Sequence, residues 1–229
     1  LQQADIFLPV SKNLGESIQQ MVLQKSFTAI PNVADTSLFN YTEQKSPGHF
    51  QFIHVSTLKN QKNPEGLLRA FATLVKEDAY QHCRLLIAGE SNDALNKYYQ
   101  QLFNSDDYVE FTGLLPYTAV AAKMKESHAL VMFSRFENLP CVIIEALCCG
   151  LPVISTHVGG IPEMIDESNG LLIDNEDEKA LLYAMKKLVG PYKNYDNKLI
   201  AKAAAEKYSY QKVGRDIADC YEHLKATGI

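Results

Sequence analysis

The feature that most constrains the fold of this chain is a series of short apolar runs separated by segments of helical periodicity. Each run is uninterrupted rather than alternating, which is typical of strands that are buried on both faces of a parallel sheet. Strands that alternate with helices in this way predict an α/β fold, an open parallel sheet with helices on both faces. The six predicted strands lie at residues 50–55, 84–88, 108–111, 129–133, 152–155 and 171–173.

The first of these helical segments also carries a recognisable start. Asn63 is a favourable cap and Pro64 a favourable first helical residue, because proline lacks the N–H that a first turn leaves unpaired. Its apolar residues fall on one helical face, namely Leu67, Leu68, Phe71, Leu74 and Val75. Further helices are predicted near the C-terminus, at residues 177–188, 194–208 and 210–225.

Before the first strand of the sheet, the pattern predicts a smaller unit. Residues 4–10 and 27–30 are predicted as strands, with a helix at 13–24 between them. The segment from Ala34 to Gly48 is polar and aperiodic, which is typical of a linker. Because the chain begins inside structured sequence, we expect it to be part of a longer protein. The predicted units are 1–34, a linker at 35–48, the sheet domain at 49–208 and a last helix at 209–229.

The composition excludes several classes of function. With 22 Lys plus Arg against 27 Asp plus Glu, the net charge is −5, and no cluster of basic residues suggests nucleic acid as a partner. No apolar stretch approaches the roughly 20 residues that span a bilayer. The five cysteines form no CxxC pair, and Cys148 and Cys149 are predicted as small buried hydrophobic residues. We therefore expect a cytoplasmic protein with reduced thiols.

The densest chemistry follows the fourth strand, at residues 134–152, SRFENLPCVIIEALCCGLP. A polar turn leads into a helix that is predicted to start at Pro140, and the unpaired N–H groups of a helix start can hold a phosphate or a sugar hydroxyl. Glu137 and Glu145 bracket this start at a separation of roughly 12 Å along the helix. Glu145 lies among apolar residues, so it is expected to be partly buried and to need a partner. Both carboxylates are predicted to contact a ligand.

The stretch FENLPCVIIEALCCGLPVISTHVGGIPEMI resembles the E-x7-E signature of the retaining GT-B glycosyltransferases of family four. Four other segments match the family in order and spacing, at residues 54–62, 86–90, 111–116 and 169–173. The resemblance covers residues from about 50 to 225. It implies a Rossmann-like domain that is the C-terminal, donor-binding half of a GT-B fold. Residues 1–34 then resemble the tail of the N-terminal domain, on which the last helix would pack.

The resemblance also implies roles for particular residues. Glu145 would bind the ribose hydroxyls and Glu137 the hydroxyls of the donor sugar. The backbone N–H groups of Asn138 and Leu139 would face the sugar or phosphate. Lys62 matches the lysine that neutralises the diphosphate.

Other implied contacts involve turns at the ends of the first and third strands. Ser56 and Thr57 match donor-binding positions, but Thr57 stands where the family usually has arginine; Lys59 is a possible substitute. Gly113 and Leu114 match the turn that cradles the base, with an ordinary tight turn as the alternative.

The roles of two further features are less specific. The glycine turn at 159–163, GGIPE, could serve structure or ligand contact. His54 and His128 are expected to be packed residues rather than bases.

Together with these residues, the resemblance implies a retaining hexosyltransferase that uses a nucleoside diphosphate sugar as donor substrate, with no cofactor and no metal. The pathway implied is cell-surface polysaccharide or glycolipid synthesis. A carbohydrate or lipid-linked acceptor would bind to the rest of the enzyme. Contact of the full-length enzyme with the inner membrane face is left open. The fragment alone is expected to bind donor without turnover. Alternatives are an inactive nucleotide-sugar-binding module, an epimerase or a phosphorylase; a dehydrogenase is disfavoured because no G-x-G-x-x-G follows a strand.

Overall fold

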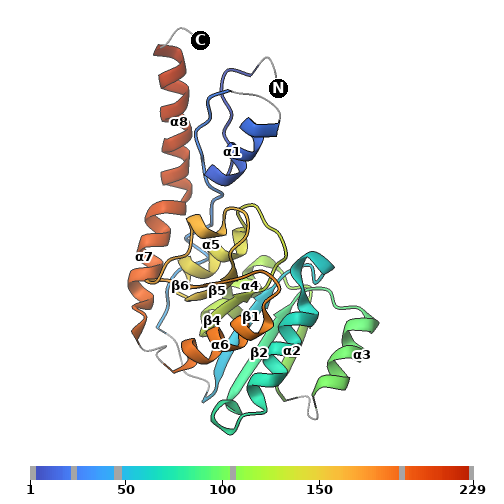
Figure 1. Cartoon of the computed structure of the whole chain (residues 1–229). Helices are drawn as coiled ribbons and strands as arrows, with labels where there is room; N and C mark the ends of the chain where they lie inside the picture. Colours follow the sequence, from blue (N-terminus) through green and yellow to red (C-terminus); the bar gives the residue numbers. More distant parts are fainter. Residues whose placement is uncertain (1–3, 22–24, 44–47, 104–106, 191–193, 227–229) are drawn as a thin grey trace.

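The computed structural model describes residues 4–21, 25–43, 48–103, 107–190 and 194–226, and its centre is a six-stranded sheet. All neighbouring strands pair in parallel, in the order β3-β2-β1-β4-β5-β6 (Figure 1). The prediction of an open parallel sheet is confirmed, and every predicted strand agrees with an observed one to within two residues. The strands are β1 Phe50–Val55, β2 Cys83–Ala88, β3 Val109–Gly113, β4 Ala129–Met132, β5 Val153–Thr156 and β6 Gly170–Ile173.

Helices cover both faces of the sheet, as predicted. One face packs on α2 (Pro64–Val75), α3 (Asp93–Leu102) and α6 (Glu178–Val189), whose buried side chains share one apolar cluster with Phe52 and Val131. The other face packs on α4 (Tyr117–Glu126), α5 (Cys141–Cys148) and α7 (Asn197–Tyr208). Short 3-10 helices also occur: η1 Asn60–Lys62, η2 Asp78–Tyr80 and η3 Ile161–Glu163.

Helix starts follow local sequence chemistry. Asn63, with φ of 49°, precedes α2, and its side-chain oxygen accepts a hydrogen bond from the N–H of Gly66 at 3.3 Å, which confirms the predicted cap. Asp177 and Asp196 cap α6 and α7 in the same way. Pro140 was predicted in the first helical turn but stands at the cap, one residue before α5.

The N-terminal unit is less regular than predicted. Its helix is α1 (Lys12–Met21), and the predicted end at residues 22–24 lies outside the described residues. The segments predicted as strands at 4–10 and 27–30 lie side by side, but their pairing is shorter than predicted and includes one isolated parallel bridge, Phe7 with Phe27. Three backbone hydrogen bonds join them, from the N–H of Phe7 to the carbonyl of Ser26, from that of Thr28 to Phe7 and from that of Ile30 to Pro9.

The predicted linker is attached to the sheet domain over the residues that the structure describes. Phe39 is fully buried within the apolar cluster of α4, α5 and α7. Ala34 is also buried, and its N–H donates to the carbonyl of Tyr208 at 3.0 Å. Residues 44–47 of the predicted linker lie outside the described chain. This segment therefore contributes side chains to the core.

The C-terminal helix α8 (Tyr210–Ala226) projects beyond the sheet, at the same end of the molecule as α1 (Figure 1). Val213 is its one buried residue among those described. Over the described residues, no helix combines the length and apolar character needed to cross a membrane. Cys148 and Cys149 are buried as predicted, and burial raises the pKa of both thiols to about 12.

Candidate functional site

The strand order creates a crevice between β1 and β4. These strands are neighbours, but the chain leaves β1 towards β2 and β3, and it leaves β4 towards β5 and β6. The loops that follow them therefore diverge, and open α/β sheets bind ligands at such a point, outside the carboxyl ends of the strands. Lys62 follows β1, and Glu137 follows β4.

Lys62 and Glu137 form an ion pair across this crevice, 75 positions apart in the chain. Their side chains are only 16% and 7% exposed. A largely buried pair of this kind holds both charged groups in place, and either charge left unpaired there would be costly. The structure thus brings together two residues that the sequence assigned to separate parts of a ligand.

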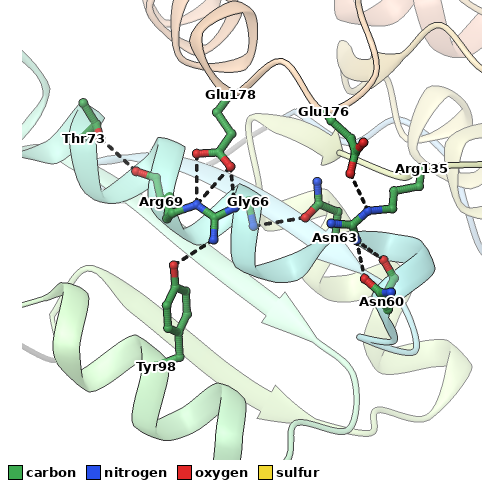
Figure 2. A network of polar contacts seen from close by, with 9 residues as sticks. All are labelled: Asn60, Asn63, Gly66, Arg69, Thr73, Tyr98, Arg135, Glu176 and Glu178. Carbon is green, nitrogen blue, oxygen red and sulfur yellow. Dashed lines mark hydrogen bonds and ion pairs between the residues drawn. The ribbon is translucent and has the colours of Figure 1, made fainter.

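Arg135 fastens the two loops to each other and to a third (Figure 2). Its backbone N–H donates to the carbonyl of Gln61 at 2.8 Å, and its guanidinium donates to the side-chain oxygen of Asn60 at 2.6 Å. The Nε atom donates to Glu176, in the loop after β6, at 2.7 Å. In return the Gln61 amide donates to the carbonyl of Phe136 at 2.9 Å. These contacts fix the main chain on both sides of the Lys62–Glu137 pair.

The glycine turn before η3 packs against the loop that carries Glu137 and Asn138. A Cβ at Gly159 would lie 1.8 Å from the carbonyl oxygen of Glu137, and the φ of Gly159 is +55°. The N–H of Gly160 donates to the carbonyl of Asn138 at 2.7 Å. The glycines therefore allow two backbone segments to pack closely. Of the two roles left open by the sequence, structure or ligand contact, these contacts show the structural one.

The segment between Glu137 and α5 presents two free donors. Within the described part of the chain, the backbone N–H groups of Asn138 and Leu139 make no hydrogen bond. The carbonyl of Leu139 is occupied by the amide of Asn32 at 2.6 Å, while the Leu139 side chain is buried. Asn138 is exposed. Free N–H groups just before a helix start can bind an anion or a hydroxyl.

Glu145 lies on α5 and is 8% exposed, as the sequence predicted. Its partner is the hydroxyl of Tyr117, which donates to Oε1 at 2.9 Å. Burial raises the pKa of Glu145, and the hydrogen bond from Tyr117 opposes that shift. The ring of Phe39 meets the ring of Tyr117 edge-on, with centroids 4.9 Å apart. A carboxylate inside the domain is thus held from a neighbouring helix.

Strand β3 ends at Gly113, which has a φ of +69°, and the turn that follows leaves Leu114 73% exposed. The carbonyl of Gly113 accepts from the N–H of Gly89 at 2.9 Å. A Cβ at Gly89 would lie 2.1 Å from the carbonyl oxygen of Ser56, so the loops after β1, β2 and β3 pack tightly together. Tyr117 begins α4 three residues after Leu114, which joins this turn to Glu145.

The end of β1 is ordered by a buried histidine. Nδ1 of His54 donates to the carbonyl of Val131 at 2.8 Å, because a carbonyl oxygen can only accept. In the neutral ring Nε2 then carries no proton, and it accepts from the Ser56 hydroxyl at 2.8 Å. Ser56 Oγ in turn accepts from the N–H of Leu58 at 3.0 Å. Burial lowers the pKa of His54 to about 4, so the ring is neutral near pH 7. As predicted, His54 is a packed residue.

Beside these loops is a hollow of about 560 Å³ lined mainly by polar residues. Thr57, which stands where the resemblance leads us to expect an arginine, is exposed and lines it together with Lys59, Arg135 and Glu90. Glu137 and Glu145 are not among its lining residues. Two cations therefore lie near the place where the sequence lacks one. Among the residues that the structure describes, no three His, Cys, Asp or Glu side chains gather closely enough to hold a metal ion.

Sequence reasoning missed two residues of this site. Arg135 lies inside the quoted motif, but its contacts involve residues about 40 and 75 positions away, and no local pattern predicts them. Tyr117 was passed over because a tyrosine at a helix start has many ordinary uses. The available signal was the expectation that Glu145 needs a partner, which named no donor.

Comparison with known proteins decides the family. The profile described as glycosyl transferases group 1 matches residues 49–190, more than half of the chain. The chain belongs to this family. The match spans every strand of the sheet and the segment that carries Glu137 and Glu145.

Relatives of this group 1 chain include the "Putative colanic acid biosynthesis glycosyltransferase WcaL" of Escherichia coli K12, 24% identical over 97% of this chain and 57% of its own length. The N-acetyl-alpha-D-glucosaminyl L-malate synthase of Bacillus anthracis is 29% identical over 74% of this chain and 46% of its own length. The chain thus spans about half the length of these relatives.

Solved structures show the same fold, that of the GT-B glycosyltransferases. Sucrose-phosphate synthase from Thermosynechococcus elongatus superposes with a TM-score of 0.85 at 22% identity, covering 99% of this chain and 60% of that one. HepE from Anabaena, in complex with UDP-glucose, superposes with a TM-score of 0.81 at 18% identity, covering 96% and 64%.

Proposed function

We propose that this chain is the donor-binding part of a retaining glycosyltransferase, which transfers a hexose from a nucleoside diphosphate sugar to an acceptor hydroxyl. The observation that carries the proposal is the buried Lys62–Glu137 pair beside the free N–H groups of Asn138 and Leu139. These groups lie at the crevice where sheets of this type bind ligands. Structures of similar fold that contain UDP or UDP-glucose support a nucleotide sugar as the donor class.

Each charged group has a task in this proposal. Lys62 lies beside the diphosphate and balances its charge, which grows as the bond between the sugar and the diphosphate breaks. Glu137, relieved of part of its pairing with Lys62, accepts hydrogen bonds from sugar hydroxyls. The N–H groups of Asn138 and Leu139 bind the sugar or a phosphate oxygen. Glu145 accepts the ribose hydroxyls, Gly113 and Leu114 cradle the base, and Ser56 and Thr57 make further contacts with the donor.

In the proposed reaction, the acceptor oxygen bonds to the anomeric carbon on the face from which the diphosphate leaves. The acceptor proton passes to an oxygen of the departing diphosphate. Lys62 and the start of α5 supply the positive charge, so the proposal needs neither a metal ion nor a cofactor. We propose that the acceptor, a carbohydrate or lipid-linked precursor of a surface polysaccharide or glycolipid, binds to parts of the enzyme that the relatives have beyond the matched length. The transfer reaction would take place in the cytoplasm, and at the inner membrane face when the acceptor is lipid-linked.

A second candidate is a nucleotide-sugar-binding module without transferase activity. Thr57 favours it, because a cation is missing from a position that the family resemblance assigns to the diphosphate. The guanidinium of Arg135, which lines the same hollow, is already bound to Asn60 and Glu176. Nucleotide-sugar binding without transfer by a chain that includes the acceptor part would favour this candidate.

The first test is calorimetry of the 229-residue chain with UDP, GDP and ADP and with their hexose conjugates. We expect one nucleotide to bind, and a Glu145→Ala variant to lose most of that binding because the ribose hydroxyls lose their acceptor. Transfer of the sugar by this chain alone is not expected, since closure of two domains completes such sites. Failure of every nucleotide and conjugate to bind the chain would contradict the proposal.

A further inference from the structure

Glu145 is oriented by a side chain from another helix, and this arrangement has a consequence for specificity. The Tyr117 hydroxyl donates to Oε1 of Glu145 at 2.9 Å. Within the described part of the chain, Oε2 accepts no hydrogen bond. A carboxylate oxygen can accept about two hydrogen bonds, so Oε2 and one remaining site on Oε1 are available to a ligand. The contact with Tyr117 selects one rotation of the carboxylate plane.

Tyr117 is itself held in place. Its ring meets that of Phe39 edge-on at 4.9 Å with an interplanar angle of 65°, and Phe39 is fully buried. The N–H of Phe39 donates to the carbonyl of Asp35 at 2.8 Å, which fixes the backbone of this segment. Tyr117 remains 50% exposed, so one side of its ring is open while its hydroxyl is bound to Glu145. The order of support runs from Phe39 through Tyr117 to Glu145.

We propose that Tyr117 is a positioning residue that orients Glu145 towards a pair of neighbouring hydroxyls, and thereby sets a preference for ribonucleotides over 2′-deoxyribonucleotides. Phe39 supports this role by restricting the Tyr117 ring. The inference rests on the proposed function, since it assumes that Glu145 accepts ribose hydroxyls. A hydroxyl pair needs both carboxylate oxygens facing it, and a carboxylate free to rotate would bind either hydroxyl alone with less discrimination.

The helix position of Tyr117 fits this task. It is the first residue of α4, and the turn of Gly113 and Leu114 ends just before it. A base held by that turn and a ribose held by Glu145 would therefore lie on two sides of the same tyrosine. Its hydroxyl has acceptor capacity left after donating to Glu145, so it can receive a further hydrogen bond from the ligand.

The test compares Tyr117→Phe with the wild-type chain, using calorimetry with UDP, GDP and ADP and then the 2′-deoxy form of the nucleotide that binds. Phenylalanine keeps the ring that packs on Phe39 and removes the hydroxyl alone. We expect about tenfold weaker binding of the ribonucleotide, the effect of one lost hydrogen bond in a buried site, and about equal binding of the deoxy form. The preference for ribose should therefore shrink by about the same tenfold factor.

The matched control is Tyr183→Phe, a tyrosine that is 67% exposed on α6, across the sheet from Glu145. It should change neither affinity. A Phe39→Leu variant should reduce the preference in the same direction by a smaller factor, because the Tyr117 ring loses its edge contact.

The outcomes separate the inference from the proposed function. Suppose that Glu145→Ala abolishes nucleotide binding, while Tyr117→Phe binds the ribonucleotide and its 2′-deoxy form as the wild type does. The proposed function then stands, and the positioning role of Tyr117 is wrong. An equal loss for ribonucleotide and deoxyribonucleotide in Tyr117→Phe would show a general structural effect and would also overturn the inference. If no nucleotide binds the wild-type chain, the proposed function fails and the inference falls with it.

Discussion

A side chain at position 159 would place its Cβ 1.8 Å from the carbonyl oxygen of Glu137, because the glycine turn and the loop after β4 touch backbone to backbone. Glycine is the one residue that fits. The contact means that the position of Glu137, and so of its pairing with Lys62, depends on a turn 22 positions further along the chain.

Replacing Gly159 with alanine is expected to destabilise the chain by about 3 kcal/mol, since the new methyl group overlaps a backbone atom that cannot give way and φ is positive. Urea unfolding measures this. Gly48→Ala is the matched control, because its φ is +77° but nothing lies within 4 Å of the added Cβ. That control should cost about 1 kcal/mol, the conformational part alone. Equal losses in the two variants would contradict the overlap.

The Lys62–Glu137 pair predicts strong thermodynamic coupling. Glu137→Gln leaves a buried ammonium without a counter-charge, and Lys62→Met leaves a buried carboxylate, so each single variant should lose about 3 kcal/mol of unfolding free energy. The double variant should lose clearly less than the sum, as a double-mutant cycle would measure.

The comparison pair for this cycle is Lys225–Glu222, whose side chains are both 72% exposed. Its coupling should be near zero, because water screens an exposed pair. Additive losses at Lys62 and Glu137 would show that their charges do not depend on each other in the folded chain.

Arg135 predicts an effect on ligand binding that exceeds its effect on stability. Arg135→Lys keeps the charge but cannot donate to Asn60 and Glu176 together, so the loop that carries Lys62 should loosen. We expect nucleotide affinity to fall about fivefold in calorimetry, with an unfolding free energy lowered by less than about 1 kcal/mol.

Arg69 provides the matched control for that variant, since Figure 2 shows it bridging Glu178 and Tyr98 by similar contacts. Arg69→Lys should leave nucleotide affinity unchanged. Equal weakening of binding by both variants would argue that charge or general stability, rather than the fastening of the loops, is responsible.

Two buried histidines predict loss of stability in acid. Burial lowers the pKa of His54 and of His128 to about 4. In the unfolded chain these histidines have the ordinary pKa of about 6.5. Between about pH 4 and pH 6.5 the unfolded chain therefore binds more protons than the folded chain. The stabilisation is complete above about pH 6.5 and is lost as the pH falls towards 4, by about 3 kcal/mol for each histidine.

Urea unfolding at a series of pH values checks this, with His128→Gln and the exposed His157→Gln as comparison variants. His128→Gln should show a shallower pH dependence than the wild type over this window, since one of the two buried imidazoles is gone. His157→Gln should follow the wild type. A His128→Gln profile parallel to that of the wild type would refute the assignment.

Much of the fold was predictable because its signals are local. An uninterrupted apolar run such as 129–133 can be buried only in the middle of a layered sheet, and Asn63 with Pro64 determines a helix start through groups within a few residues. The same locality explains the failures. Residues 4–10 and 27–30 have strand-like sequences, but only a few of their residues pair, at one bridge and three backbone hydrogen bonds.

The sequence by itself determined the parallel α/β sheet and the positions of its strands. It also determined that Glu137 precedes a helix and Glu145 lies within it, since periodicity and residue type suffice for these features. Only the tertiary structure decided that Lys62 pairs with Glu137, that Arg135 joins three loops and that Tyr117 and Phe39 support Glu145. Hydrogen bonds, ion pairs and ring contacts act over a few ångströms, and their partners here are 28 to 78 positions apart in the chain. Which of many polar side chains meet is therefore set by how strands and helices pack, and no local pattern carries that information.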